Sequence, residues 1–333
     1  MAAEQGYDLR DPMAQDDFVE RVKKSIEKSK NNNIAVFGKR IESLFAYVAG
    51  ALGKVKLLKQ EDSGDLYFVG DEVLAPDYRV IMIDGAHFFV EVKNCHLKHP
   101  KEKFTLKKEY YKKLRTYCEI NGLDLKFAIY FSGWNMWSLL SIHSFVEQNL
   151  VYVIDLPSAL AKSEMSLLGD CMVGTAPNLE LHLIAAPDEA SKIEESGQAV
   201  FVTRSVRIYC AGKEVVDEQE KRIAFYLMRF GEWEESETEA IVLENKLQGM
   251  KFIFSPKSQE EPNFAIIGNL STMVSNGFRE LTIKDGEVVS LTLGIDPAAF
   301  GALIPDDYSG EGLPLWRFTI KPNPEFQNNR DEN

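Results

Sequence analysis

The chain has 333 residues, a formal net charge of −13 and 45% apolar residues, a size and composition suited to about two domains with apolar cores. It contains no run of about eighteen apolar residues, which argues against a transmembrane helix. The N-terminus lacks the basic and apolar parts of a signal peptide, and the four separated cysteines fit neither a zinc spacing nor a disulfide framework. We therefore expect a cytoplasmic protein with reduced thiols and no membrane partner.

The charge is divided unevenly between the two halves of the chain. Residues 1–150 carry 22 Lys and Arg against 21 Asp and Glu, a net charge of +1. Residues 151–333 carry 16 against 30, a net charge of −14. The total charge argues against a nucleic-acid partner, but the first half is not acidic. We therefore expect two domains with different functions, at residues 1–150 and 151–333.

Two helices are predicted at the start of the chain, over residues 14–30 and 35–52. The second helix carries an apolar stripe made of Ile41, Leu44, Phe45 and Val48. Glu42 lies at the edge of this stripe, where a carboxylate can point into a cleft while the helix packs on a sheet. The alternative is a solvated surface glutamate. Strands are predicted next, over residues 54–59 and 65–69, with a turn between them.

Residues 76–93 predict two strands joined at Asp84-Gly85. The residues on either side of this pair are rich in Val, Ile, Phe and Tyr, and Asp-Gly between two such runs is a strong hairpin signal. Charged residues lie only at the two ends of the hairpin and at its turn, apart from Arg79. Folding the hairpin therefore brings the charged ends together.

The register of this hairpin decides which charged residues meet. With a two-residue turn, the side chains of Asp77 and Glu91 would lie on different faces of the sheet. We instead predict a three-residue loop over residues 83–85, with Gly85 in the left-handed conformation. This loop pairs Met82 with Ala86 and places Asp77 opposite Glu91.

Asp77, Glu91 and Lys93 form a pattern suited to phosphodiester chemistry. Glu91 and Lys93 are two residues apart and so share one face of their strand. Two adjacent carboxylates disfavour joint ionisation, and a divalent cation such as Mg²⁺ removes this conflict. A neighbouring lysine can stabilise charge on a phosphate or orient a water molecule.

This arrangement resembles the PD-(D/E)XK nuclease superfamily, which includes restriction endonucleases and archaeal-type Holliday junction resolvases. The matching residues are Pro76-Asp77 and Glu91-Val92-Lys93, with Glu42 at the place of the glutamate on the preceding helix. The resemblance covers residues 34–140. It implies that Glu42, Asp77 and Glu91 bind Mg²⁺ or Mn²⁺, with the Val92 carbonyl as a further ligand, and that Lys93 acts in catalysis.

A basic run follows the hairpin, and much of it lies on a helix predicted over residues 105–119. Such a face beside a metal cluster would follow the phosphates of a nucleic acid. The alternative is an ordinary solvated face. A buried strand is predicted over residues 125–131. The candidate phosphate-binding residues are Lys98, Lys101, Lys103, Lys107, Lys108, Lys112 and Lys113.

The second half alternates predicted strands and helices without a motif that identifies a function. Helices are predicted over residues 155–168, 217–230 and 269–278. Strands are predicted over 151–154, 179–184, 199–209 and 250–254, and a hairpin over 282–293. The order of the last elements is that of a winged helix, but a basic recognition face is missing. We expect an α+β domain that serves protein contact, in a homodimer or with a partner subunit, or regulation.

The fold class predicted overall is an α/β nuclease core, with a mixed central sheet flanked by helices, followed by a second α+β domain. The leading functional hypothesis is a metal-dependent endonuclease that acts on DNA, in bacterial or phage defence or in DNA processing. RNA is not excluded. The alternatives are a non-catalytic nucleic-acid-binding or regulatory module that retains the fold, a structure-selective resolvase, and an RNA-cutting enzyme.

Overall fold

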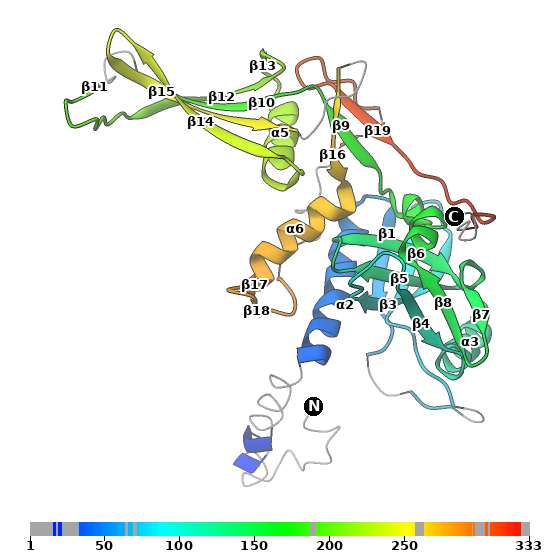
Figure 1. Ribbon diagram of the computed structural model, residues 1–333. Helices are drawn as coiled ribbons and strands as arrows, with labels where there is room; N and C mark the ends of the chain where they lie inside the picture. Colours follow the sequence, from blue (N-terminus) through cyan, green and yellow to red (C-terminus); the bar gives the residue numbers. More distant parts are fainter. Residues whose placement is uncertain are drawn as a thin grey trace.

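A mixed five-stranded sheet lies at the centre of the first half of the chain, in the order β1-β2-β3-β5-β6 (Figure 1). β3 and β5 run parallel, and the other neighbours are antiparallel. The strands are β1 (Val55–Gln60), β2 (Tyr78–Met82), β3 (His87–Cys95), β5 (Leu125–Phe131) and β6 (Met136–Ser141). The computed structural model describes residues 16–17, 19–21, 33–63, 66–68, 72–186, 191–256, 263–294, 296, 304–305 and 307–327.

Helices pack on both faces of this sheet. Helix α2 (Asn33–Ala51) packs on one face, and α3 (Lys108–Asn121) lies in the connection between the parallel strands β3 and β5, where a crossover is required. Side chains of a strand alternate between its faces. In β3, Val90 and Val92 join the buried cluster around α2, whereas Phe89 contacts the ring of Tyr117 on α3. The fold is therefore mixed α/β, as predicted.

The hairpin of β2 and β3 has the predicted three-residue loop. The amide of Met82 donates to the carbonyl of Ala86 at 2.8 Å, and Gly85 has a φ of 90°. Tyr78 pairs with Val90, so continuing the register by one residue places Asp77 opposite Glu91. The predicted register is confirmed. Gly85 permits the positive φ at the loop without the steric cost that a Cβ would add.

A second, three-stranded sheet lies beside α3 in the order β4-β8-β7. Its strands are β4 (Lys103–Lys107), β7 (Val146–Gln148) and β8 (Val151–Asp155), and the short helix η2 (Ile142–Ser144) precedes β7. Leu106 of β4 pairs with Tyr152 of β8 and is buried. The helix predicted over residues 105–119 therefore begins too early. Residues 105–107 belong to β4, which pairs with β8, and α3 begins only at Lys108.

The second half of the chain begins with short elements packed beside the central sheet. These are α4 (Leu156–Ala161) and η3 (Met165–Leu168), followed by the sheet β16-β9-β19, made of β16 (Ala265–Asn269), β9 (Met172–Thr175) and β19 (Leu315–Phe318). A helix over residues 155–168 was expected to be continuous. It is interrupted because the Ser163 hydroxyl accepts from the amide of Leu139 at 3.2 Å, which ties this segment to β6.

A long antiparallel sheet projects from the second half as an arm (Figure 1). One of its faces is apolar: Leu181 pairs with Ile208 and Phe252, and Leu183 pairs with Val206 and Met250. Helix α5 (Glu218–Phe230), capped by Asp217, packs on the base of this face. The arm strands are β10 (Leu179–Ala185), β11 (Ser191–Lys192), β12 (Thr203–Cys210), β13 (Lys213–Val215), β14 (Glu235–Leu243) and β15 (Lys246–Ser255).

Helix α6 (Leu270–Thr282) joins the second half to the first by packing on α2. Phe278 is fully buried, and its ring lies 5.0 Å from the ring of Tyr47. The Arg40 guanidinium donates to the hydroxyl of Thr282 at 2.8 Å. The core of the first half is thus completed by residues from the second. The division into separate domains at residues 1–150 and 151–333 stays a prediction.

Several other predicted elements can be compared with the structure. The predicted helices at 35–52, 217–230 and 269–278 correspond to α2, α5 and α6. The hairpin expected over 282–293 is confirmed but shorter, as β17 (Ile283–Lys284) and β18 (Glu287–Val288). Residues 66–68 are not a strand, because β1 pairs directly with β2 and these residues lie exposed in the connection.

Two predicted segments fall partly outside the described residues, the helix over 14–30 and the strand over 65–69. Of the helix expected over residues 14–30, residues 16–17 and 19–21 are described and are helical. The strand expected over 199–209 begins only at Thr203.

None of the helices in the described part of the chain is long and apolar enough to cross a membrane.

We expect Phe278→Ala to lower the free energy of unfolding by about 3–5 kcal/mol, the usual cost of removing a fully buried Phe side chain. Phe225→Ala is the matched control, because Phe225 is 44% exposed on α5. The measurement is urea unfolding of the full chain with each variant. A loss below about 1 kcal/mol for Phe278→Ala would contradict the packing of α6 on α2.

Candidate active site

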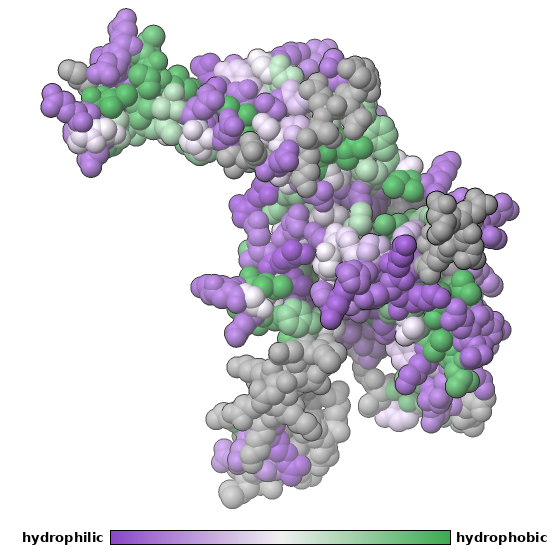
Figure 2. Space-filling model, viewed as in Figure 1, coloured by the Kyte–Doolittle hydropathy of each residue, from purple (hydrophilic) through white to green (hydrophobic). Residues whose placement is uncertain are grey.

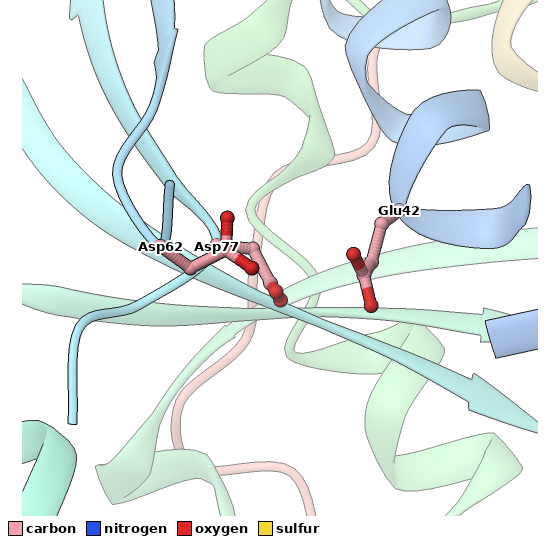
Figure 3. A group of neighbouring side chains, drawn as sticks. All are labelled: Glu42, Asp62 and Asp77. Carbon is pink, nitrogen blue, oxygen red and sulfur yellow. The ribbon is translucent and has the colours of Figure 1, made fainter. Parts of the chain in front are cut away.

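Three carboxylates from separate segments meet where β1 ends and β2 begins (Figure 3). Glu42, Asp62 and Asp77 each offer an oxygen within 4.8 Å of the other two. Among the residues that the structure describes, this is the one such group of three or more acidic, His or Cys side chains. Carboxylates this close disfavour joint ionisation, so the group needs a shared proton or a neighbouring cation.

The fold explains how these residues come together. Glu42 lies on α2 beside the buried residues Ile41 and Phe45, and its carbonyl accepts from the Tyr78 hydroxyl at 3.1 Å. Asp77 immediately precedes β2. Because β1 and β2 are antiparallel neighbours, the end of β1 lies beside the start of β2, and Asp62 follows β1 there.

Asp77 is the most buried member of the group, with 8% of its surface exposed. Its Oδ2 accepts from the amide of Val92 at 2.7 Å, which fixes the carboxyl group against β3. Burial, followed by the charges of Glu91 and Glu42, raises the pKa of Asp77 to about 8. A bound divalent cation would favour the ionised carboxylate and so oppose this shift.

Lys39 is a cation that already lies at the acidic group. Its ammonium contacts the Glu42 carboxylate one turn along α2 and lies 3.3 Å from Asp62. Burial opposes the charge of Lys39, but Glu42 and Asp62 outweigh this effect and raise its pKa. Lys39 therefore offsets part of the repulsion between the carboxylates.

Glu91 and Lys93 lie on the face of β3 that is turned toward α3. Glu91 is 3% exposed, and its Oε1 contacts the ammonium of Lys93 and accepts from the Tyr110 hydroxyl at 2.5 Å. Burial opposes the charge of Lys93, but Glu91 and Tyr110 outweigh it and raise the pKa of Lys93. Lys93 is therefore held as a cation, which suits it to stabilise negative charge and not to act as a base.

The structure brings the predicted residues together in two adjoining groups. Glu42 and Asp77 belong to the carboxylate group, and Glu91 and Lys93 form the ion pair on β3. The amide of Val92 links the two groups through Asp77. The roles of these residues, including the metal contact expected from the Val92 carbonyl, stay predictions.

The predicted phosphate-binding lysines differ in their surroundings. Lys108 contacts Glu147, and Lys113 contacts Glu72, so their charges are partly neutralised. The remaining five are exposed: Lys98, Lys101, Lys103, Lys107 and Lys112. Their contact with a nucleic acid stays a prediction.

Two residues of this region were not expected from the sequence. Asp62 was assigned to a turn, although its position directly after a predicted strand was an available signal. The spacing of Tyr110 from Leu106, Leu114 and Tyr117 predicts an apolar stripe on this helix, and Tyr110 does pack against the buried cluster around Leu114. Its hydroxyl is also directed toward Glu91 and Lys93. This second contact depends on the position of α3 over the charged face of β3.

The donor atoms of the carboxylate group fit a hard divalent cation. Mg²⁺ and Mn²⁺ prefer carboxylate and water oxygens. Glu42, Asp62 and Asp77 supply oxygens from three different segments. The group therefore has the donor atoms that a divalent metal requires, with Lys39 beside it.

Comparison with known proteins does not assign this chain to a family. No protein-family model matches the chain, and no curated protein matches it. One similar solved structure is Archaeoglobus fulgidus Hjc, a Holliday junction resolvase from an archaeal hyperthermophile. The match has 15% identity and a TM-score of 0.23, and it covers 28% of this chain and 78% of the resolvase chain. A likeness at this level establishes neither a shared fold nor a shared activity.

We expect Asp62→Asn to weaken Mn²⁺ binding by at least ~10-fold, the lower limit typical of groups that only orient a metal ligand. Asp124→Asn is the control, because Asp124 is an exposed carboxylate outside the group. The measurement is the rise in melting temperature of the full chain as Mn²⁺ is added, which reports binding to the folded state. Equal metal stabilisation of Asp62→Asn and wild type would remove Asp62 from the site.

Proposed function

We propose that this protein is a divalent-metal-dependent endonuclease that hydrolyses phosphodiester bonds of DNA. The observation that carries the proposal is the carboxylate group of Glu42, Asp62 and Asp77 beside the ion pair of buried Glu91 and partly exposed Lys93. Grouped carboxylates that can bind a cation, with a fixed positive charge next to them, are the components that metal-assisted phosphodiester hydrolysis requires.

Glu42, Asp62 and Asp77 would hold the metal, and Glu91 would complete the site from β3. A bound Mg²⁺ would polarise the phosphate and lower the pKa of a water molecule. The Val92 amide keeps Asp77 in place through its 2.7 Å hydrogen bond. The protein thus orients the carboxylates before any ligand arrives, which limits the reorganisation needed on binding.

Lys93 would stabilise negative charge that develops on the scissile phosphate. Its ammonium is held by Glu91 and by the Tyr110 hydroxyl, which lies 3.1 Å away. A cation with a raised pKa remains charged at neutral pH. A fixed charge of this kind contributes more at a partly buried site than it would in open water.

The five exposed lysines near α3 would bind the phosphate backbone. They lie on β4, on the connection between β3 and β4, and on the first half of α3. Tyr110 in the first turn of α3 reaches Glu91, so this helix leads from the basic surface to the site. Phosphate contacts of this type supply affinity without distinguishing DNA from RNA.

The second half would serve protein contact. Its net charge of −14 disfavours phosphate binding. The projecting arm carries exposed apolar residues (Figure 2), among them Val206, Val242 and Leu243. Exposed apolar patches of this kind are typical of contact surfaces. A homodimer and a partner subunit both fit these features. A role in defence or in DNA processing remains part of the same proposal.

We expect purified protein to cut DNA with Mg²⁺ or Mn²⁺ and not with a chelator. Asp77→Ala and Glu91→Ala should abolish cutting because each removes a carboxylate of the site. Lys93→Ala should lower the rate on the order of 10²–10³-fold while metal binding is kept, as for the loss of one charge stabiliser. Lys56→Ala is the control, because Lys56 is exposed on β1.

The substrates are linear, branched and single-stranded DNA together with RNA, so that the same assay separates a general endonuclease from a resolvase or an RNA-cutting enzyme. If the wild type is inert on all of them with both metals, the non-catalytic alternative is favoured. If Lys93→Ala cuts at the wild-type rate, the mechanism is wrong.

A second experiment tests the basic surface. We expect replacement of Lys101, Lys103, Lys107 and Lys112 by Gln to weaken DNA binding and flatten its salt dependence, by about 0.9 in the log–log slope for each lysine that contacts a phosphate. The control replaces the same number of exposed lysines in the acidic half, at Lys213, Lys246, Lys284 and Lys321. An equal effect of the two variants would show that only total charge matters.

A further inference from the structure

Tyr110 connects α3 to the ion pair on β3 through both its hydroxyl and its ring. The hydroxyl donates to Glu91 Oε1 at 2.5 Å and accepts from the Lys93 ammonium at 3.1 Å. The same ammonium lies 4.8 Å from the centre of the Tyr110 ring. The carboxylate of Glu91 and the ammonium of Lys93 on β3 therefore contact each other and the hydroxyl of Tyr110 on α3.

The surroundings of Tyr110 differ from those of its neighbours on α3. Leu114, one turn later, is fully buried in an apolar cluster. The ring of Tyr111 contacts the rings of Phe127 and Tyr152. Tyr110 packs against the same apolar cluster but is only partly buried, and its hydroxyl contacts the charged pair. Phe would supply the same ring, so the hydroxyl is the part of Tyr110 that joins it to the charged pair.

The two hydrogen bonds restrict the positions of both charged groups. Lys and Glu side chains have many rotamers, and holding them in one arrangement costs conformational entropy. A hydrogen bond to a charged group contributes more than one between neutral groups. Tyr110 thus keeps the Lys93 ammonium at a defined place beside Glu91 and directs one carboxylate oxygen, Oε1, toward α3.

We propose that Tyr110 is a positioning residue for the Glu91–Lys93 pair in phosphodiester hydrolysis, an inference that rests on the function proposed above. Tyr110 acts through Lys93 and Glu91 and does not itself touch the reacting atoms. Its hydroxyl holds the ammonium where the charge of the transition state develops. Small displacements of such a group lower the rate strongly because stabilisation depends on preorganised geometry.

The kinetic test compares Tyr110→Phe with Tyr111→Phe, an identical change at the adjacent position. We expect Tyr110→Phe to lower kcat on the order of 10–100-fold, as for the loss of a hydrogen bond to a charged group, with KM for DNA changed less than about twofold. Tyr111→Phe should leave both values near wild type. Equal kcat values for Tyr110→Phe and wild type, with an active wild type, would overturn the inference and leave the nuclease proposal intact.

A double-mutant cycle separates positioning from a general structural effect. If Tyr110 acts through the Glu91–Lys93 pair, Tyr110→Phe should lower the rate by a smaller factor in the Lys93→Ala background than in the wild type. A structural role would instead lower the rate of Lys93→Ala by the same factor as it lowers the wild-type rate. Such additive losses would contradict the proposal.

A third readout does not need nuclease activity. The rate at which an acylating reagent labels Lys93 is measured by mass spectrometry at one pH, with exposed Lys103 as the internal reference. We expect Tyr110→Phe to increase Lys93 labelling severalfold relative to wild type, and Tyr111→Phe to leave it unchanged. An unchanged rate in Tyr110→Phe overturns the inference. An increased rate in a protein that is inert on every substrate would retain the positioning of Lys93 and reject the nuclease function.

Discussion

The register between β2 and β3 determines whether the charged residues of this chain can form a site. Asp77 immediately precedes β2 and Glu91 lies in the middle of β3, and a slip of one residue would send their side chains to opposite faces. The three-residue loop, with Gly85 at positive φ, prevents this slip. The Val92 amide then bonds to Asp77, and this contact connects the carboxylate group with the ion pair on β3.

Electrostatic repulsion is the main cost of the arrangement. Glu42, Asp62 and Asp77 lie close together, and burial together with Glu91 and Glu42 raises the pKa of Asp77 to about 8. Lys39 and Lys93 offset part of this cost from two sides. Replacing these acids by neutral residues would remove the repulsion, so their presence favours a function that needs concentrated negative charge.

The two halves of the chain are physically coupled even though their charges differ. Helix α6 from the acidic half packs on α2, and α2 carries both Glu42 and Lys39. The indole of Trp137 on β6 donates to the hydroxyl of Ser275 on α6 at 3.0 Å. The second half of the chain therefore packs on the helix that carries Glu42, whereas the arm extends away from the site (Figure 1).

The sequence by itself determined the features that depend on neighbouring residues. Alternation of apolar residues and the Asp-Gly turn were sufficient to predict β2 and β3. Their register was predicted by also requiring that Asp77 and Glu91 meet, because the turn alone allowed a two-residue loop. The apolar stripe of α2 likewise predicted that Glu42 lies at its edge. These signals are local, because turn geometry and the periods of helix and strand are set within a few residues.

Only the tertiary structure decided the features that depend on distant segments. Asp62 joins the site because β1 pairs with β2, and Tyr110 faces the ion pair because α3 crosses over the charged face of β3. Pairing with β8 made a strand of residues that have a helical pattern, and the contact of Ser163 with β6 interrupted a predicted helix. Hydrogen bonds and burial between distant segments outweigh local propensity. A short window of sequence does not include the distant residues that form them.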